Sequence, residues 1–330
     1  MKEYRVLEEK KQYLQCHTIC TSEELWRFVE CCHNSKDYVF RGVNEAKYMC
    51  YTSAQVRTKA ELDQNAYVEI ISKAIQKVRE STIIMDYLRA HSKDESDFQI
   101  LALMQHYGCG TPIMDFSTNI DSALFFATDR KDGIIQTACK DDKRIESFIS
   151  VYSFNMRDPD HYPIQKVFEN DSEKLKELDK EAREDSGVLY SGISQQTKNS
   201  FYYLPFKELA MLNNGGLFAV AGHPNGIINI EIGDMSIEYD VYNERIDAQN
   251  GLFLFNGLSD SPYEEAALNW CFNIKNYCFN IHKSLENEIH DYLKIKNITR
   301  STIYPETEES QCIMKELRQL DIPDFLKPLD

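Results

Sequence analysis

Hydrophobic residues recur three or four positions apart, the spacing of a helix face, over residues 22–29 and 66–90, and three further stretches of this chain also read as helical. Cap-forming residues support two of the stretches, since Ser22 precedes two glutamates and Thr118 stands three residues before Asp121. Gly108 marks the end of another, because glycine commonly follows a helix C-terminus. The predicted helices cover residues 22–29, 66–90, 98–107, 122–127 and, as two helices with a turn at 304–305, 285–317.

Short runs of β-branched and aromatic residues between these stretches predict strands. The runs cover residues 38–41, 148–154, 217–221, 226–232 and 252–255. Helices and strands intermix without strict alternation, which favours an α+β fold over a doubly wound sheet. We therefore expect a mixed or antiparallel sheet core with flanking helices.

Composition and charge narrow the class of protein. The 330 residues carry a net charge of −16, which argues against a broad surface for nucleic acid or anionic membrane but leaves a local basic cleft open. No apolar run approaches the roughly 20 residues of a membrane span, and no signal peptide follows Met1. The ten cysteines are scattered without a Cys-x-x-Cys pair, so we expect reduced thiols in a cytoplasmic protein with no membrane partner.

The tripeptide Phe40-Arg41-Gly42 places an arginine at the end of a predicted strand. An arginine beside core residues needs an anionic partner, and the glycine permits a sharp turn or the close approach of a ligand. Asp115, between two apolar residues, is the candidate partner inside the chain. The sequence thus leaves two readings of Arg41, an ion pair with Asp115 and direct contact with a ligand.

A second group of polar residues surrounds the loop after Gly108. Loops held between packed helices commonly carry binding groups, and the ordinary pKa of histidine suits His106 to acid–base work or to a helix-end hydrogen bond. Cys109 next to it suggests a Cys–His dyad as a lesser alternative. The group consists of Gln105, His106, Tyr107, Asp115, Ser117 and Thr118.

Several of these motifs, in this order, resemble the FRG domain family. They are Phe40-Arg41-Gly42, Gln-His-Tyr-Gly at 105–108, the Asp-Phe-Ser-Thr segment at 115–118 before 123–127, a second signature at 245–253 and a closing segment at 298–305. The resemblance implies an FRG domain over residues 21–320, an N-terminal extension over 1–20 and a C-terminal tail over 321–330. Residues 169–185 are almost solidly charged and are predicted to be an insertion or a surface helix, with an acidic docking surface as the alternative. Where the family usually has an arginine, this chain has Pro112, which leaves Arg41 as the main cation of the site.

A second resemblance, to arginine-type ADP-ribosyltransferases, suggests a reaction. In that family an Arg-Gly strand end contacts the pyrophosphate of NAD and a Ser-Thr-Ser element lies near the ribose, positions that Arg41-Gly42 and Ser117-Thr118 would match. The third element of the family carries a catalytic glutamate, but this chain has the amide Gln249 there. The resemblance implies that Arg41 binds pyrophosphate, Ser117 contacts ribose, Gln249 positions the acceptor, and His106 and Asp115 support the site.

We therefore expect an FRG-domain protein with a nucleotide-binding cleft around Arg41. The resemblances imply NAD as substrate, with NAD glycohydrolysis or ADP-ribosyl transfer to a nucleic-acid or protein acceptor, in bacterial defence or as a toxin. The alternative is a non-enzymatic module that recognises a nucleic acid or a protein partner through the same cleft. A phosphodiester hydrolase using His106 and Asp115 ranks last, because no metal-ligand cluster accompanies them.

Overall fold

The computed structural model describes residues 1–35, 38–91, 95–130, 141–155, 206–207, 217–221, 230–232, 235–237, 244–270 and 276–329. A seven-stranded sheet in the order β1-β9-β4-β2-β3-β8-β5 forms its centre. β1 runs parallel to β9, and the other neighbours pair antiparallel, so the expected mixed sheet of an α+β fold is confirmed. The strands of this sheet are β1 (Gln15–Ile19), β2 (Tyr38–Val43), β3 (Ile113–Ser117), β4 (Phe148–Asn155), β5 (Leu217–Ala221), β8 (Gly251–Asn256) and β9 (Tyr277–His282). A two-stranded sheet pairs β6 (Ile230–Ile232) with β7 (Met235–Ile237).

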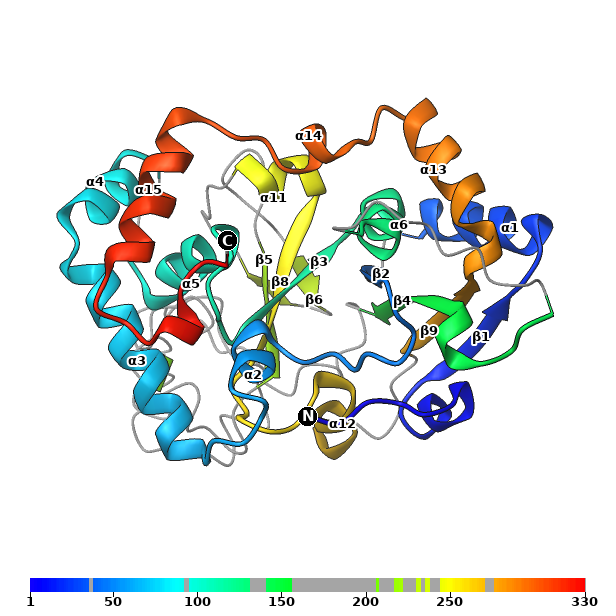
Figure 1. The fold of residues 1–330 in the computed structure, drawn as a ribbon, viewed down its shortest axis with the longest axis horizontal. Helices are drawn as coiled ribbons and strands as arrows, with labels where there is room; N and C mark the ends of the chain where they lie inside the picture. The colour runs from blue at the N-terminus through cyan, green and yellow to red at the C-terminus, as the bar shows by residue number, and fades with distance from the viewer. Residues whose placement is uncertain are drawn as a thin grey trace, which may run out of the picture.

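Helices flank the sheet in two groups. In Figure 1, α3, α4, α5 and α15 lie together on the left, whereas α1, α6 and α13 lie together at the upper right. The α-helices are α1 (Ser22–His33), α2 (Ser53–Arg57), α3 (Gln64–Glu80), α4 (Thr82–His91), α5 (Asp97–His106), α6 (Ile120–Thr128), α11 (Glu244–Gln249), α12 (Tyr263–Trp270), α13 (Glu286–Ile295), α14 (Arg300–Ile303) and α15 (Glu308–Gln319). The 3-10 helices are η1 (Leu7–Gln12), η2 (Ile145–Ser147), η4 (Lys283–Leu285) and η5 (Asp324–Leu326).

The alternation of side chains along the strands builds one core on each face of the sheet. On β2, Val39 joins the larger core, whereas its neighbour Phe40 joins the smaller core with Ala123 and Leu124 of α6. On β4, Val151 and Tyr152 divide in the same way. Successive residues of a strand point to opposite faces, so both faces of the central strands are covered and the strands are strongly apolar.

Several predicted element boundaries need correction. The helix predicted over 66–90 is two helices, because Ser81 adopts an extended backbone between α3 and α4. The cap of α6 is Asn119, whose side chain accepts a hydrogen bond from the Asp121 N–H, whereas the Thr118 hydroxyl donates to the Asn250 carbonyl, in the turn before β8. β2 continues to Val43, so Arg41 lies within the strand and not at its end. The strand predicted over 226–232 is described only as β6, and residues 169–185 lie outside the described residues.

The sheet consists of two halves joined by a single pair of residues. β2 pairs with β4 over its whole length, and β3 does the same with β8, but β2 and β3 pair only at Phe40 and Ser117. Beyond this pair the two strands diverge. The gap that opens is bordered by Arg41 on β2 and Asp115 on β3, and we call it the seam.

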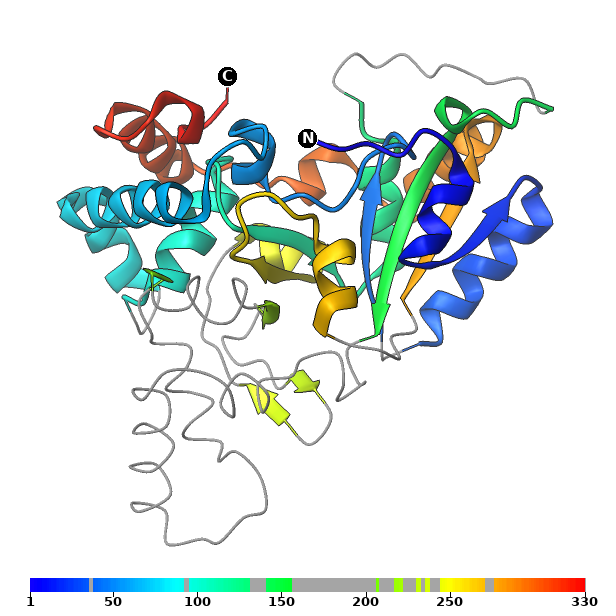
Figure 2. The same ribbon diagram turned by 90° about the horizontal axis from the view of Figure 1, so that it is seen from below.

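The chain ends pack against this core. Near the N-terminus, β1 supplies an edge strand of the main sheet. Near the C-terminus, Leu326 of η5 is fully buried, and its carbonyl accepts a hydrogen bond from the Gly110 N–H. Figure 2 shows the N-terminal elements η1, β1 and α1, in blue, at the opposite end of the molecule from α15, in red. In the described part of the chain, no helix has the length and apolar character to cross a membrane. The division into an extension over 1–20, a domain over 21–320 and a tail over 321–330 stays a prediction.

Candidate functional site

Two adjoining cavities lie at the seam. The larger, of about 290 Å³, is bordered by residues 40–44 of β2 and its end, by Tyr48 and by Phe116. The smaller, of about 90 Å³, is bordered by Gln105, His106, Arg245 and Gln249. Asp115, Phe126 and Tyr304 line both. We call the two cavities together the seam cleft.

The Arg41 guanidinium spans the seam. Its Nη1 donates a hydrogen bond of 2.6 Å to the backbone carbonyl of Asp115, and its carbon lies 5.9 Å from the centre of the Phe116 ring. No other acceptor among the described residues is within hydrogen-bond reach of the guanidinium. An arginine carries five N–H donors, so most donors of Arg41, which lines the larger cavity, have no partner among the described residues.

The Asp115 carboxylate faces the same cleft but has a different partner from the one its sequence suggested. It accepts a hydrogen bond from the Gln105 side-chain amide, and its carboxylate makes no ion pair within 4.0 Å of Arg41 among the described residues. Burial raises the pKa of Asp115, and the charge of Arg41 and the Gln105 hydrogen bond oppose part of that rise. Arg41 therefore ties β2 to β3 through a carbonyl, and both charged groups remain turned to the cavity.

Gln105 and His106 are fixed where α5 ends. The Gln105 carbonyl oxygen accepts from the hydroxyl groups of Thr111 and Ser53, which orients its amide toward Asp115. His106 lines the smaller cavity, and its backbone carbonyl accepts a 2.7 Å hydrogen bond from Arg245. Gly108 then takes a φ of 76°, as expected of the glycine that ends a helix. Cavity walls thus come from two segments that are about 140 residues apart in the sequence.

Gln249 lies in the smaller cavity, whereas Ser117 and Thr118 lie outside both. The Gln249 side-chain amide donates to the carbonyl of Ile303, which anchors α11 to α14. The buried Ser117 hydroxyl donates to the Gln249 carbonyl at 2.6 Å and accepts from the Asn119 N–H at 2.9 Å. Their predicted contacts with a ligand stay predictions, and the contacts that the structure assigns to Ser117 are internal.

Gly42 borders the larger cavity but serves a packing contact. A Cβ atom at this position would lie 1.8 Å from the Ala123 carbonyl oxygen and 2.6 Å from the Ala127 nitrogen of α6. Only a glycine allows the helix backbone to come so close to β2. The sequence suggested that Gly42 lets a ligand come close to the backbone of β2. In the structure, α6 of the same chain takes this close position.

The aromatic and cationic walls of the cleft were not recognised as site residues from the sequence. Tyr304 lies between two guanidinium groups, with Arg245 at 5.2 Å and Arg300 at 5.5 Å from its ring centre. Burial raises the pKa of Tyr304 to about 12, so its hydroxyl stays neutral. Arg300 is also paired with Asp129 at 3.0 Å. The signal was present, since Tyr304 and Arg245 belong to the two C-terminal segments that carried the FRG resemblance.

The suggested Cys–His dyad lacks an activated thiol. Cys109 is buried and lines neither cavity, and burial raises its pKa to about 12. A nucleophilic cysteine needs the opposite shift, because the thiolate is the reactive form.

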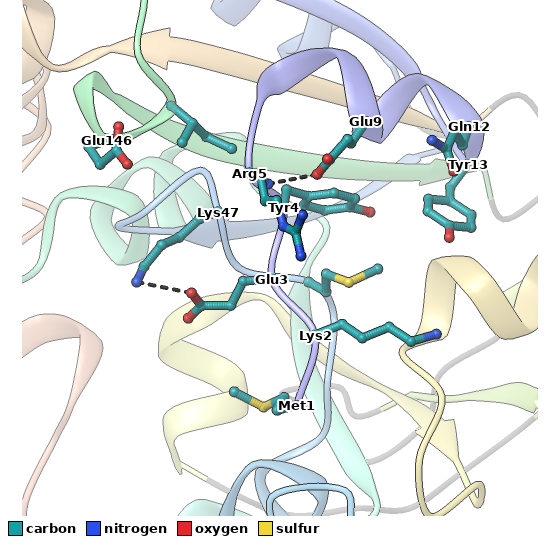
Figure 3. Close-up of a pocket in the computed structure, with 12 residues that line it drawn as sticks. Met1, Lys2, Glu3, Tyr4, Arg5, Glu9, Gln12, Tyr13, Lys47 and Glu146 are labelled. Carbon is teal, nitrogen blue, oxygen red and sulfur yellow. Dashed lines mark hydrogen bonds and ion pairs between the residues drawn. The ribbon is translucent and has the colours of Figure 1, made fainter.

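A larger cavity, of about 800 Å³, lies away from the seam against the N-terminal segment. Figure 3 shows its lining of mixed charge, in which Lys47 pairs with Glu3 and the Arg5 N–H donates to Glu9. Lys2, which also lines it, pairs with Glu265 outside the cavity at 2.9 Å. The seam cleft, although smaller, is the one that gathers the residues singled out from the sequence.

These residues can now be compared with known proteins. Residues 36–133 match the FRG domain. The match includes Arg41, Gln105, His106 and Asp115, whereas Arg245, Gln249 and Tyr304 lie outside it. No curated protein and no solved structure matches the chain. The FRG match therefore contains only part of the residues that line the seam cleft. The ADP-ribosyltransferase resemblance rests on the sequence motifs alone.

Proposed function

We propose that the seam cleft binds a small nucleotide-like anion whose phosphate group contacts Arg41. The observation that carries this proposal is the Arg41 guanidinium itself, which uses one hydrogen bond to hold the strands, has donors left without a partner among the described residues, and lines a cavity of about 290 Å³. Guanidinium groups match the geometry of phosphate oxygens and bind them through paired hydrogen bonds.

The charge of the cleft supports an anionic ligand. Arg41 lines its larger cavity and Arg245 its smaller one, and Asp115 is the one carboxylate among the described residues that line it. Burial raises the pKa of Asp115, so a proton neutralises this carboxylate at a higher pH than it neutralises an exposed aspartate. A chain of net charge −16 thus has a locally basic cleft.

The aromatic walls suit the planar part of a nucleotide. Tyr48, Phe126 and Tyr304 border the larger cavity, and aromatic rings in a partly dry site bind bases by stacking. The larger cavity alone is at the lower end of the roughly 300–1,000 Å³ of small-molecule sites, which suits one nucleotide unit. The smaller cavity adjoins it along Asp115, Phe126 and Tyr304, and a dinucleotide would need both.

NAD is our leading candidate within this class, because the Arg-Gly and Ser-Thr motifs occur in the order of the arginine-type ADP-ribosyltransferases. Cleavage of NAD needs a carboxylate that stabilises an oxocarbenium-like transition state. Gln249 cannot provide this charge, but Asp115 in its ionised form is placed beside Arg41 to do so. NAD glycohydrolysis or ADP-ribosyl transfer is the reaction that we propose for this site.

Binding and catalysis are tested separately. Titration of AMP and NAD by calorimetry should give an affinity for wild type that Arg41→Gln lowers by about tenfold to a hundredfold, the effect of losing one charge-assisted hydrogen bond. Arg27→Gln is the matched control, because Arg27 is an exposed residue of α1 paired only with Glu23. Release of nicotinamide from NAD, with and without cell lysate, tests the reaction.

The outcomes discriminate between the readings of the site. No binding of either nucleotide, or equal binding by wild type and Arg41→Gln, contradicts the proposed ligand class and favours a module that recognises a protein. Binding without nicotinamide release retains the ligand class and contradicts the reaction.

A further inference from the structure

A pair of cysteines outside the seam cleft occupies facing positions on β1 and β9. Cys16 and Cys278 are direct neighbours in the register of these two parallel strands. Paired strands lie roughly 4.8 Å apart, and neighbours in register point to the same face. This separation lies within the roughly 4.4–6.8 Å between the Cα atoms of a disulfide. Both cysteines are free thiols in the structure.

A buried ammonium group stands over this pair. The Lys10 side chain of η1 is fully buried, and its Nζ lies 3.4 Å from Cys278 Sγ, 2.8 Å from Ser150 Oγ and 2.9 Å from Asn280 Oδ1. It also lies 5.2 Å from the ring centre of Tyr152. A buried cation needs a compensating negative charge, and the nearest group that can supply one is the Cys278 sulfur.

The two thiols and the ammonium group share protons unevenly. Burial raises the pKa of Cys278, but the neighbouring Cys16 thiol and the charge of Lys10 together bring it below its ordinary value. The pKa of Cys16 is raised, first by the neighbouring Cys278 and then by burial. The pair therefore holds one thiolate and one thiol at lower pH than an ordinary pair of cysteines.

We propose that Cys16 and Cys278 form an oxidative modification site that a small hydroperoxide converts to a disulfide. Cys278 is fully buried, and Cys16 is only partly buried, so a molecule of the size of hydrogen peroxide reaches the pair from the Cys16 side. A thiolate beside a cation and next to a second thiol is the usual arrangement of a redox-sensitive cysteine.

The reaction balances with hydrogen peroxide as the oxidant. The thiolate of the pair attacks one peroxide oxygen, a sulfur–oxygen bond forms as the oxygen–oxygen bond breaks, and the leaving hydroxide takes a proton from solvent. The second thiol then attacks the sulfenic sulfur, the disulfide forms, and the sulfur–oxygen bond breaks with release of water. Two thiols are oxidised by two electrons, and one peroxide is reduced to two waters.

The test uses the full chain with Cys20→Ser as background, which leaves Cys16 as the one cysteine in the tryptic peptide 12–27. After exposure to hydrogen peroxide and alkylation of the remaining thiols, mass spectrometry should find this peptide linked to peptide 276–283. Lys10→Met should slow the linkage roughly tenfold at pH 7, the factor that accompanies one pKa unit. Lys73→Met, at an exposed position of α3 that pairs with Glu69, should leave the rate unchanged.

A second variant decides the question if Lys10→Met does not fold. Cys16→Ser should stop the reaction at a sulfenic acid on Cys278, which dimedone traps and mass spectrometry locates. The proposal is overturned if the exposed cysteines Cys31 and Cys312 are oxidised while Cys16 and Cys278 are recovered as free thiols. Equal rates in the two folded lysine variants would also overturn the role of Lys10.

Discussion

Replacing Gly42 with alanine tests whether this glycine serves packing or ligand approach. The added Cβ would lie 1.8 Å from the Ala123 carbonyl oxygen, and real Cβ contacts are essentially never shorter than 3.0 Å. β2 and α6 would therefore have to separate by more than about 1 Å. Both obstructing groups, at Ala123 and Ala127, belong to the helix backbone and cannot rotate away.

The size of the effect follows from this rigidity. Inserting one methylene into a packed core typically costs about 1–3 kcal/mol, because neighbouring side chains adjust. Here the neighbours are backbone atoms, so we expect the free energy of unfolding to fall by about 3 kcal/mol or more. This is a large part of the roughly 5–15 kcal/mol that stabilises a typical folded protein.

Urea unfolding followed by circular dichroism measures this loss, and Gly251→Ala is the matched control. Gly251 is also a strand glycine, but a Cβ there would meet its nearest atom, in Ile246, at an ordinary 3.4 Å. The control should stay within about 1 kcal/mol of wild type, since a tolerated alanine reduces the entropy of the unfolded chain. If Gly42→Ala is as stable as the control but loses affinity for nucleotide, our interpretation is wrong and Gly42 is a ligand-binding residue.

Two further predictions concern Ser117 and Asp115. Ser117→Ala should lower the free energy of unfolding by about 1–3 kcal/mol, because two buried backbone groups lose their partner, and should leave the affinity for NAD unchanged; a loss of affinity at full stability would instead indicate contact with the ribose. The affinity of wild type for NAD should increase as the pH falls through the raised pKa of Asp115, above its ordinary 3.8, because protonation removes the negative charge beside Arg41. Calorimetry of Asp115→Asn should give an affinity that varies less with pH over the same range, and an identical pH profile would refute this role of Asp115.

The pattern of the sequence was enough to place most strands and helices. The apolar run before Arg41 and the glycine that follows α5, Gly108, were recognisable because they depend on neighbours a few residues away. The sequence also indicated that Arg41 and Asp115 lie close together, since each needed a partner in an apolar setting. The structure confirms their proximity, and it shows that Arg41 contacts the carbonyl and not the carboxylate.

What the sequence did not reveal depends on contacts between distant segments. The role of Gly42 became visible only with the position of α6, about 80 residues later. Tyr304 was one of 36 phenylalanines and tyrosines, and although it lies in the closing segment of the FRG resemblance, only the structure shows the two arginines beside its ring. The hydrogen-bond partner of Ser117, the Gln249 carbonyl, is 132 residues away in the chain. Because the sequence does not show this partner, the Ser117 hydroxyl was interpreted as a group that binds a ligand.

Because β2 and β3 share one ladder pair, Phe40–Ser117, and one side-chain hydrogen bond, from Arg41 to the Asp115 carbonyl, we expect the width of the seam cleft to be adjustable. A sheet with continuous pairing resists tilting at every rung of its ladder, whereas one rung acts as a pivot about which the halves can rotate. Substitutions buried far from Arg41, in either half, can then alter ligand affinity by changing the angle between the halves while every residue that touches the ligand stays the same. In that case, natural substitutions that change ligand affinity would accumulate in the two cores of the protein. A comparison of cleft residues alone would not detect them.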